Sequence, residues 1–130
     1  MHVCRSGHLV EVETPAKVNL FLEVLGRRSD GYHELETLMT TFSVCDWLSC
    51  RAEPGGELRL DCRWAPGLEA QQAEARRSQA PSPWELLPEG EENLVYRAVA
   101  RLRQRASVAQ GATLRLVKSI PAAAGLGGAS

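Results

Sequence analysis

The chain has 130 residues, of which 15 are lysine or arginine and 16 are aspartate or glutamate, so its formal net charge is −1. That length suffices for one domain, and a hydrophobic share of 44% with a charged share of 24% is typical of a globular protein. A charge this close to zero argues against a general affinity for nucleic acid. No apolar run approaches the roughly 20 residues that cross a bilayer, so we expect no membrane-spanning segment.

The N-terminal residues and the cysteines indicate a cytoplasmic protein. Residues 1–13 contain charged side chains and lack the continuous apolar stretch of a secretory signal. Cys4, Cys45, Cys50 and Cys62 form no C-x-x-C pair and have no histidines at the spacing of zinc ligands. We therefore expect reduced cysteines that pack as small apolar residues, and no metal site built from them.

Strand-like patterns fill the first half of the chain. Alternating or β-rich runs predict strands at residues 8–13, 17–26, 35–44, 47–52 and 57–62. Leu20, Phe21 and Leu22 are consecutive apolar residues, so we expect the second strand to be buried on both faces. The first half is therefore predicted to form a β meander or a Greek-key-like layer.

Residues 63–91 differ in composition from what surrounds them. Four prolines and many glutamine, glutamate and arginine residues interrupt any sustained apolar period, apart from a short helix predicted at residues 69–77. We interpret this stretch as a surface insertion, which Trp64 and Trp84 can dock against the body of the protein.

A helix and one more strand are predicted after this insertion. Five apolar residues recur at the spacing that places them on one face of a helix: Leu94, Val95, Ala98, Val99 and Leu102. Asn93 is a suitable N-cap for this helix. Residues 112–118 alternate between apolar and polar and predict a strand.

The strongest chemical signal is the glycine segment, residues 121–130, with the sequence P-A-A-A-G-L-G-G-A-S. Gly125, Gly127 and Gly128 permit positive φ angles and a close approach of the backbone to a ligand. Successive N–H groups in such a segment form an anion cradle, and the Ser130 hydroxyl could add a contact to a phosphate oxygen or a metal. The segment lacks the P-loop spacing G-x-x-x-x-G-K-S/T and the context of a dinucleotide-binding fingerprint. A flexible Gly/Ala turn is the alternative interpretation.

Two further segments carry side chains suited to binding. Lys17 and Asn19 are two residues apart in a predicted strand, so their side chains share a face and suit an anionic or hydroxyl substrate. Tyr32 and His33 follow a predicted turn, where the phenol ring can stack on a nucleobase and the imidazole can hydrogen-bond to it. The alternatives are a solvated lysine at a strand end and an ordinary exposed turn.

Together these segments resemble a known family. The sequences P-A-K-V-N-L-F-L, D-G-Y-H, E-N-L-V-Y-R-A and I-P-A-A-A-G-L-G-G-A-S, in this order, are similar to motifs of the GHMP kinase superfamily. Within this superfamily, the D-G-Y-H turn makes the chain resemble most the kinases that act on a diphosphocytidyl methylerythritol. The resemblance runs from about residue 14 to residue 130, apart from residues 63–91. This resemblance implies an α+β fold of the type found in the N-terminal domain of GHMP kinases, which is ribosomal protein S5 domain 2-like. It also implies that the domain is truncated in this chain.

This resemblance also implies a role for each segment. Lys17 would lie beside the reacting hydroxyl as the catalytic cation, with Asn19 in the same pocket, and Tyr32 and His33 would recognise the cytosine base. The glycine segment would wrap the phosphates of ATP with residues Pro121, Ala122, Ala123, Ala124, Gly125, Leu126, Gly127, Gly128, Ala129 and Ser130. The implied reaction, a step of non-mevalonate isoprenoid biosynthesis, transfers the γ-phosphoryl group of ATP to the 2-hydroxyl of the methylerythritol moiety with the help of Mg²⁺. The implied partner is a small-molecule substrate, with no nucleic acid and no membrane.

The resemblance does not extend to a catalytic base. In the family the base is an aspartate beyond the glycine segment, so we expect it after residue 130 and assign this role to none of Asp30, Asp46 and Asp61. The chain would then be the N-terminal portion of a longer kinase, without its C-terminal domain and inactive alone.

Two alternatives remain beside this interpretation. Another GHMP-type kinase, of the homoserine or mevalonate type, fits the glycine segment equally well, but the D-G-Y-H turn argues against it. A non-catalytic S5-like RNA-binding module fits the implied fold, but the net charge of −1 argues against nucleic acid.

Overall fold

The fold is built on a mixed sheet with two longer helices in the second half of the chain. A computed structural model describes residues 1–79, 87–121 and 125–127. In chain order the elements are β1 (His2–Ser6), β2 (Leu9–Arg27), β3 (His33–Glu53), β4 (Leu58–Trp64), α1 (Pro66–Arg77), the 3₁₀ helix η1 (Gly90–Glu92), α2 (Leu94–Arg105) and β5 (Gly111–Lys118).

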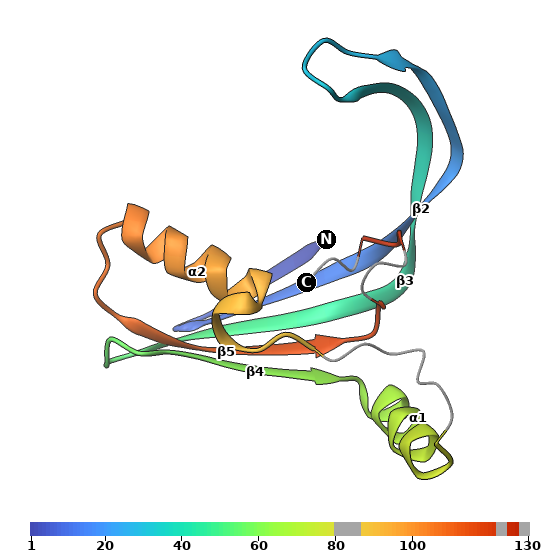
Figure 1. The fold of residues 1–130 in the computed structure, drawn as a ribbon. Helices are drawn as coiled ribbons and strands as arrows, with labels where there is room; N and C mark the ends of the chain where they lie inside the picture. Colours follow the sequence, from blue (N-terminus) through green and yellow to red (C-terminus); the bar gives the residue numbers. More distant parts are fainter. Residues whose placement is uncertain (80–86, 122–124, 128–130) are drawn as a thin grey trace.

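The strands follow the order β1-β2-β3-β5-β4 across the sheet (Figure 1). β1, β2 and β3 are antiparallel neighbours in a meander, as predicted for the first half. β4 does not continue this meander: it lies at the sheet edge beyond β5 and runs parallel to it. A parallel pair needs a crossover connection, and here the chain from β4 to β5 contains α1 and α2.

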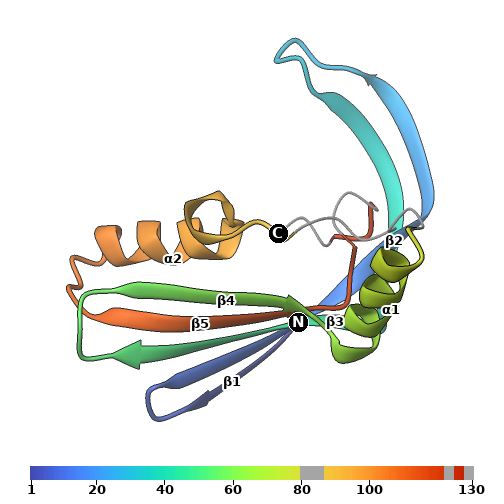
Figure 2. The same ribbon diagram turned by 60° about the horizontal axis from the view of Figure 1, so that its bottom comes forward.

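The hydrophobic core lies between the sheet and α2. Figure 2 shows this helix over β4 and β5, and Ala112, Leu114 and Leu116 of β5 are buried on alternate positions. Only part of the predicted helix face contributes to the core. Val99 is half-buried, whereas Leu102 is 68% exposed, because the predicted apolar positions cover a wider arc than the side that meets the sheet.

β2 and β3 are each one continuous strand, where separate strands were predicted. Beyond a shift of register between Pro15 and Ala16 they form a long hairpin, the arm (residues 16–42), which curls away from the sheet (Figure 1). The predicted burial of the apolar run in β2 is wrong, since the exposed fractions of its residues are 64%, 47% and 52% for Leu20, Phe21 and Leu22. In the described part of the chain neither β1 nor β5 pairs with the arm, so both of its edges stay open, and the exposed apolar residues show that its faces are largely uncovered as well.

Two boundaries also differ from the sequence predictions. β4 runs to Trp64 and so extends into the first residues of the predicted insertion, and the Trp64 side chain is buried in the core. The helix predicted inside the insertion is confirmed as α1, which begins at Pro66 because proline suits the first turn of a helix. Trp84 lies outside the described residues. β1 was not predicted at all, since its residues are exposed and show no apolar alternation.

None of the helices in the described residues combines the length and hydropathy that crossing a membrane requires.

Candidate functional site

Two segments far apart in the sequence meet at the base of the arm. The backbone N–H of Lys17 donates a hydrogen bond of 2.8 Å to the carbonyl oxygen of Leu126 in the glycine segment. The Lys17 side chain also packs closely there, because a Cβ atom added at Gly127 would lie 3.1 Å from Lys17 Cγ. The structure thus brings together the predicted catalytic lysine and the predicted phosphate-binding segment.

The register shift in the β2–β3 pair explains how Lys17 reaches this place. Pro15 pairs with Cys45, but the next residue, Ala16, pairs with Phe42, so two residues of β3 have no partner in β2. An irregularity of this kind bends a strand pair and increases its twist. Lys17 is the first residue beyond the buried Ala16 and therefore stands where the arm leaves the sheet.

Lys17 and Asn19 share one face of the arm, as their spacing predicts. Their partners in β3 are Thr41 and Met39, with no shift of register between the two pairs. The Asn19 side chain is exposed and Lys17 is half-buried. Lys17 therefore lies where the arm meets the glycine segment, while Asn19 lies further along the arm.

The glycine segment has the backbone conformation that the sequence predicts where it is described. Gly125 and Gly127 have φ angles of +71° and +89°, in the region that residues with a Cβ atom rarely adopt. Pro121 is half-buried, and Leu126 between the two glycines is half-buried as well. The other residues predicted to bind ATP lie outside the described residues: Ala122, Ala123, Ala124, Gly128, Ala129 and Ser130.

An aspartate that the sequence analysis left without a role lies beneath the start of the glycine segment. Asp46 Oδ1 accepts hydrogen bonds from the backbone N–H groups of Ser119 (2.7 Å) and Ile120 (2.9 Å), while Oδ2 lies 2.6 Å from Lys118 Nζ. Asp46 is 5% exposed and Lys118 is fully buried. In the sequence Asp46 stands between the strands predicted at residues 35–44 and 47–52, and an acidic residue there is the signal that could have revealed it.

Further buried polar groups adjoin this ion pair. Asn93 is fully buried and caps α2 as predicted, since its Oδ1 accepts from Val95 N–H at 2.9 Å, and its Nδ2 donates to the Pro88 carbonyl at 3.0 Å. Burial raises the pKa of the Cys62 thiol, and this outweighs the opposite effects of the Lys118 charge and a hydrogen bond with Asn93. Cys62 is therefore a neutral thiol near neutral pH and a poor nucleophile.

Tyr32 and His33 lie at the far end of the arm from Lys17. The turn before them is fixed by Asp30, whose carboxylate accepts from Tyr32 N–H at 3.1 Å, and by Gly31 with a φ angle of +88°. The Tyr32 side chain is 74% exposed. The described structure does not bring this pair into contact with the glycine segment.

His33 nevertheless lies on the same face of the arm as Lys17. The pairing of the arm shifts register between Asn19 and Phe21 and between Val24 and Gly26, but both extra residues lie in β2. Residues 33–41 of β3 all have partners, so alternate residues of this strand share a face, and Thr41 is the partner of Lys17. The strand between these two positions is roughly 26 Å long at about 3.3 Å per residue, and the arm curls back toward the side of the sheet that carries α2 (Figures 1 and 2). One face of a curved hairpin therefore connects the two predicted binding regions.

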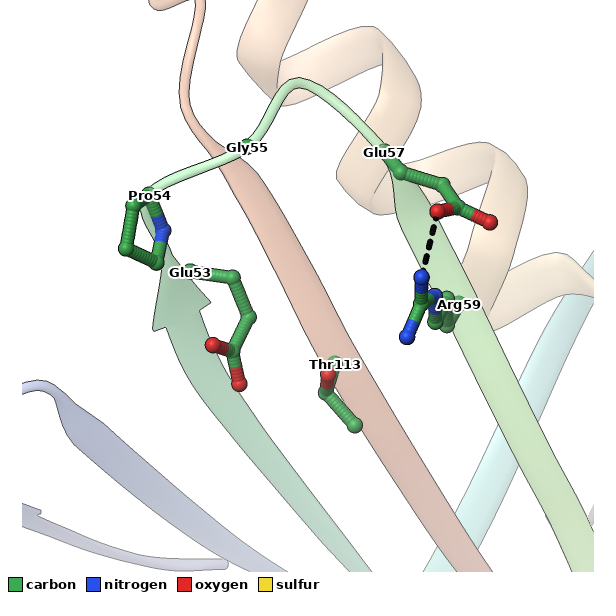
Figure 3. Close-up of a pocket in the computed structure, with 6 residues that line it drawn as sticks. All are labelled: Glu53, Pro54, Gly55, Glu57, Arg59 and Thr113. Carbon is green, nitrogen blue, oxygen red and sulfur yellow. Dashed lines mark hydrogen bonds and ion pairs between the residues drawn. The ribbon is translucent and has the colours of Figure 1, made fainter.

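A cavity of about 290 Å³ lies at the opposite end of β5 from the glycine segment (Figure 3). It is lined by Glu53, Pro54, Gly55, Glu57, Arg59 and Thr113. Arg59 and Glu57 form an exposed ion pair of 2.7 Å, and Glu53 adds a further carboxylate, so this lining does not suit a phosphate. In the described ranges no group of three or more His, Cys, Asp or Glu residues is placed to hold a metal ion. We therefore take the base of the arm, not this cavity, as the candidate site.

Comparison with known proteins points to one enzyme. The 4-diphosphocytidyl-2-C-methyl-D-erythritol kinase of Methylococcus capsulatus is 40% identical over 121 residues, which are 93% of this chain and 34% of that protein. The kinase of the same name from a Synechococcus strain is 42% identical over 122 residues, or 93% of this chain and 33% of that protein. The chain thus spans about a third of the length of these curated relatives, and it matches their N-terminal third.

Solved structures show the same relationship. A crystal structure of 4-(cytidine 5'-diphospho)-2C-methyl-D-erythritol kinase matches 91% of this chain and 34% of its own, with a TM-score of 0.63 and 37% sequence identity. A homoserine kinase from Cytophaga hutchinsonii matches 98% of this chain and 32% of its own with a TM-score of 0.58, but at 16% identity this shows the fold alone. The predicted GHMP kinase fold is confirmed by these two structures. No family model matches the chain.

The contact between Gly127 and Lys17 can be tested with alanine substitutions at two glycines. Gly127→Ala introduces a Cβ atom at a positive φ and against Lys17 Cγ, so we expect the Lys17–Leu126 hydrogen bond to open more often. Amide exchange at Lys17, measured by NMR, should be about tenfold faster in this variant than in Gly125→Ala, because the crowding against Lys17 adds to the left-handed strain that both variants share. Gly125→Ala is the matched control, because its φ is also positive but no atom of the described residues lies within 4 Å of its Cβ position. Equal acceleration in both variants would contradict the contact.

Proposed function

Because the chain belongs with the N-terminal third of the 4-diphosphocytidyl-2-C-methyl-D-erythritol kinases, we propose that it forms part of an enzyme that phosphorylates the 2-hydroxyl of that substrate with ATP. In this proposal the glycine segment holds the ATP phosphates, Lys17 acts at the acceptor hydroxyl, and the end of the arm holds the cytidine base. The proposed product is an intermediate of isoprenoid biosynthesis.

The observation that carries the proposal is the contact between Lys17 and residues 126 and 127. A phosphoryl transfer site needs N–H donors around the phosphates and a cation where negative charge develops between donor and acceptor. At the base of the arm, a glycine-rich backbone segment lies against Lys17, which is the only lysine of the arm. The names of the relatives supply the identity of the acceptor substrate, and the word kinase in them supports ATP as the phosphoryl donor.

Lys17 would act mainly in the transition state. The γ-phosphoryl group and the attacking oxygen share negative charge during transfer, and an ammonium group nearby stabilises that charge without first having to reorient water. The stem of the Lys17 side chain packs against Gly127, and this contact would limit how far the ammonium group can move. The base that removes the hydroxyl proton would come from outside this chain.

Mg²⁺ is part of the proposal as the ion that accompanies ATP and neutralises charge on its phosphate oxygens. Kinase sites usually hold this ion through the substrate phosphates and one or two carboxylates. The proposal therefore needs no cage of protein ligands within the described residues, where none is found.

The arm would align the acceptor substrate between its two ends. The substrate has a base at one end and the reacting hydroxyl at the other, joined by a diphosphate, and so it is an elongated molecule. Tyr32 and His33 at the tip and Lys17 and Asn19 at the base are suited to these two ends, and His33 and Lys17 share a face of the arm. Base recognition at the tip would then place the hydroxyl near Lys17.

The role of the Lys17 charge can be tested in the enzyme at the full length of its relatives. Lys17→Ala and Lys17→Met both remove the ammonium group, and Lys17→Met keeps the stem that packs on Gly127. We expect kcat to fall about a hundredfold in both, as for the loss of other transition-state contacts, while the KM for ATP changes little. Arg5→Met, which removes an exposed charge in β1, is the control. An unchanged kcat in Lys17→Met would remove this residue from the catalytic site.

Recognition of the base can be tested at His33 in the same enzyme. His33→Ala removes the proposed hydrogen bonds to the cytosine edge, each worth about 1 kcal/mol or more when its partner stays buried. The KM for the diphosphocytidyl substrate should rise about tenfold and the KM for ATP should stay the same. His8→Ala, an exposed histidine in the turn between β1 and β2, serves as the control. A similar rise in both KM values would mean that His33 is structural.

A further inference from the structure

Asp46 makes three contacts that all lie at the point where β5 ends and the glycine segment is about to begin. One carboxylate oxygen accepts two backbone N–H groups, from Ser119 and Ile120, and the other oxygen pairs with Lys118 Nζ. The ladder between β3 and β5 ends at Val117, and the parallel ladder to β4 ends at Lys118. The two amides therefore lie beyond the last strand partners.

Buried backbone N–H groups need an acceptor, and here a side chain provides it. Ile120 is 2% exposed, so water does not readily replace the carboxylate at its amide. The following residue is Pro121, which has no N–H group to offer. The direction in which the chain leaves β5 is thus set by one carboxylate oxygen.

Lys118 compensates the charge that this arrangement buries. A carboxylate out of water is costly unless it is paired and fully hydrogen-bonded, and both conditions are met by Lys118 Nζ at 2.6 Å and the two amides. The carbonyl oxygen of Lys118 also accepts a hydrogen bond of 2.8 Å from Ala65 N–H, at the start of α1. Lys118 is therefore held by its backbone to the start of α1 and by its side chain to Asp46 in β3.

We propose that Asp46 is a positioning residue for ATP: it fixes Ser119 and Ile120 at the entry to the glycine segment, so that the N–H groups of residues 125–127 further along are preset for the triphosphate. The inference rests on the proposed function. The segment is then held at two points, by Asp46 at its entry and by the Lys17–Leu126 hydrogen bond further on. Donors that are already in place bind a phosphate without the entropy cost of ordering a loop.

The test compares two double variants of the enzyme at the full length of its relatives. D46L/K118M and D46N/K118M both remove the ion pair and both charges, and they differ in whether residue 46 offers an oxygen to Ser119 and Ile120. Replacing a buried ion pair by apolar residues of similar size is often tolerated. Asp46→Glu is a third variant, which keeps the charge and shifts the oxygens by one methylene group, and it replaces D46L/K118M if that protein does not fold.

Two measurements decide between the variants. Amide exchange at Ser119 and Ile120, followed by NMR, should be at least about tenfold faster in D46L/K118M than in D46N/K118M, as expected for the loss of a hydrogen-bond acceptor. The Kd for a non-hydrolysable ATP analogue with Mg²⁺, measured by calorimetry, should be about tenfold higher in D46L/K118M. The Kd for cytidine diphosphate, the probe for the acceptor site, should be the same in both.

Three results would overturn the inference: equal amide exchange in the two variants, equal affinity for the ATP analogue, or a loss of affinity for cytidine diphosphate as large as that for the analogue. The last of these would mean that Asp46 supports the whole fold and not the glycine segment in particular. Failure of the proposed function has a different signature. A wild-type enzyme that binds the ATP analogue but transfers no phosphoryl group contradicts the proposed reaction, and the comparison of the variants still decides the role of Asp46.

Discussion

The hydrogen bond from Lys17 N–H to the Leu126 carbonyl is the interaction on which the candidate site depends. It joins the start of the arm to the glycine segment, which are encoded near opposite ends of the chain. Without it Lys17 would be an ordinary charged residue at the beginning of a hairpin, and the glycine segment would be a loop without a cation. The contact of Gly127 with the lysine stem adds a steric reason for glycine at that position.

Two features of the sheet make this contact available. The shift of register between Pro15 and Ala16 releases the arm from the sheet immediately before Lys17. Asp46, in the neighbouring strand, holds the chain where it leaves β5 and uses Lys118 to balance its charge. The site is thus prepared by backbone geometry and one buried ion pair, both on the rigid part of the fold, while its ligands would bind at the exposed end.

The sequence predicted the elements of this fold better than their extent. β-rich runs and an N-cap at Asn93 identified the strands and α2, because these signals are local. The apolar run Leu20–Leu22 looked like a buried strand, yet its burial depends on whether another layer packs over its faces. In the described structure the run pairs with β3, but its side chains stay exposed. Asp46 could not be assigned from sequence, since its partner Lys118 is 72 residues away and its other partners are backbone amides. Lys17, by contrast, could be predicted as a site residue from sequence, because its neighbours form a recognisable motif.

The most direct test of this account is a nuclear Overhauser measurement between Lys17 and Gly127. If the base of the arm holds the glycine segment, the α protons of Gly127 should give cross-peaks to the β and γ protons of Lys17, since an added Cβ atom at Gly127 would come within 3.1 Å of Lys17 Cγ. Cross-peaks from Lys17 to its strand partner Thr41 serve as the internal reference. A spectrum in which Lys17 shows the contacts to Thr41 and none to Gly127 would contradict the central claim that these two segments form one site.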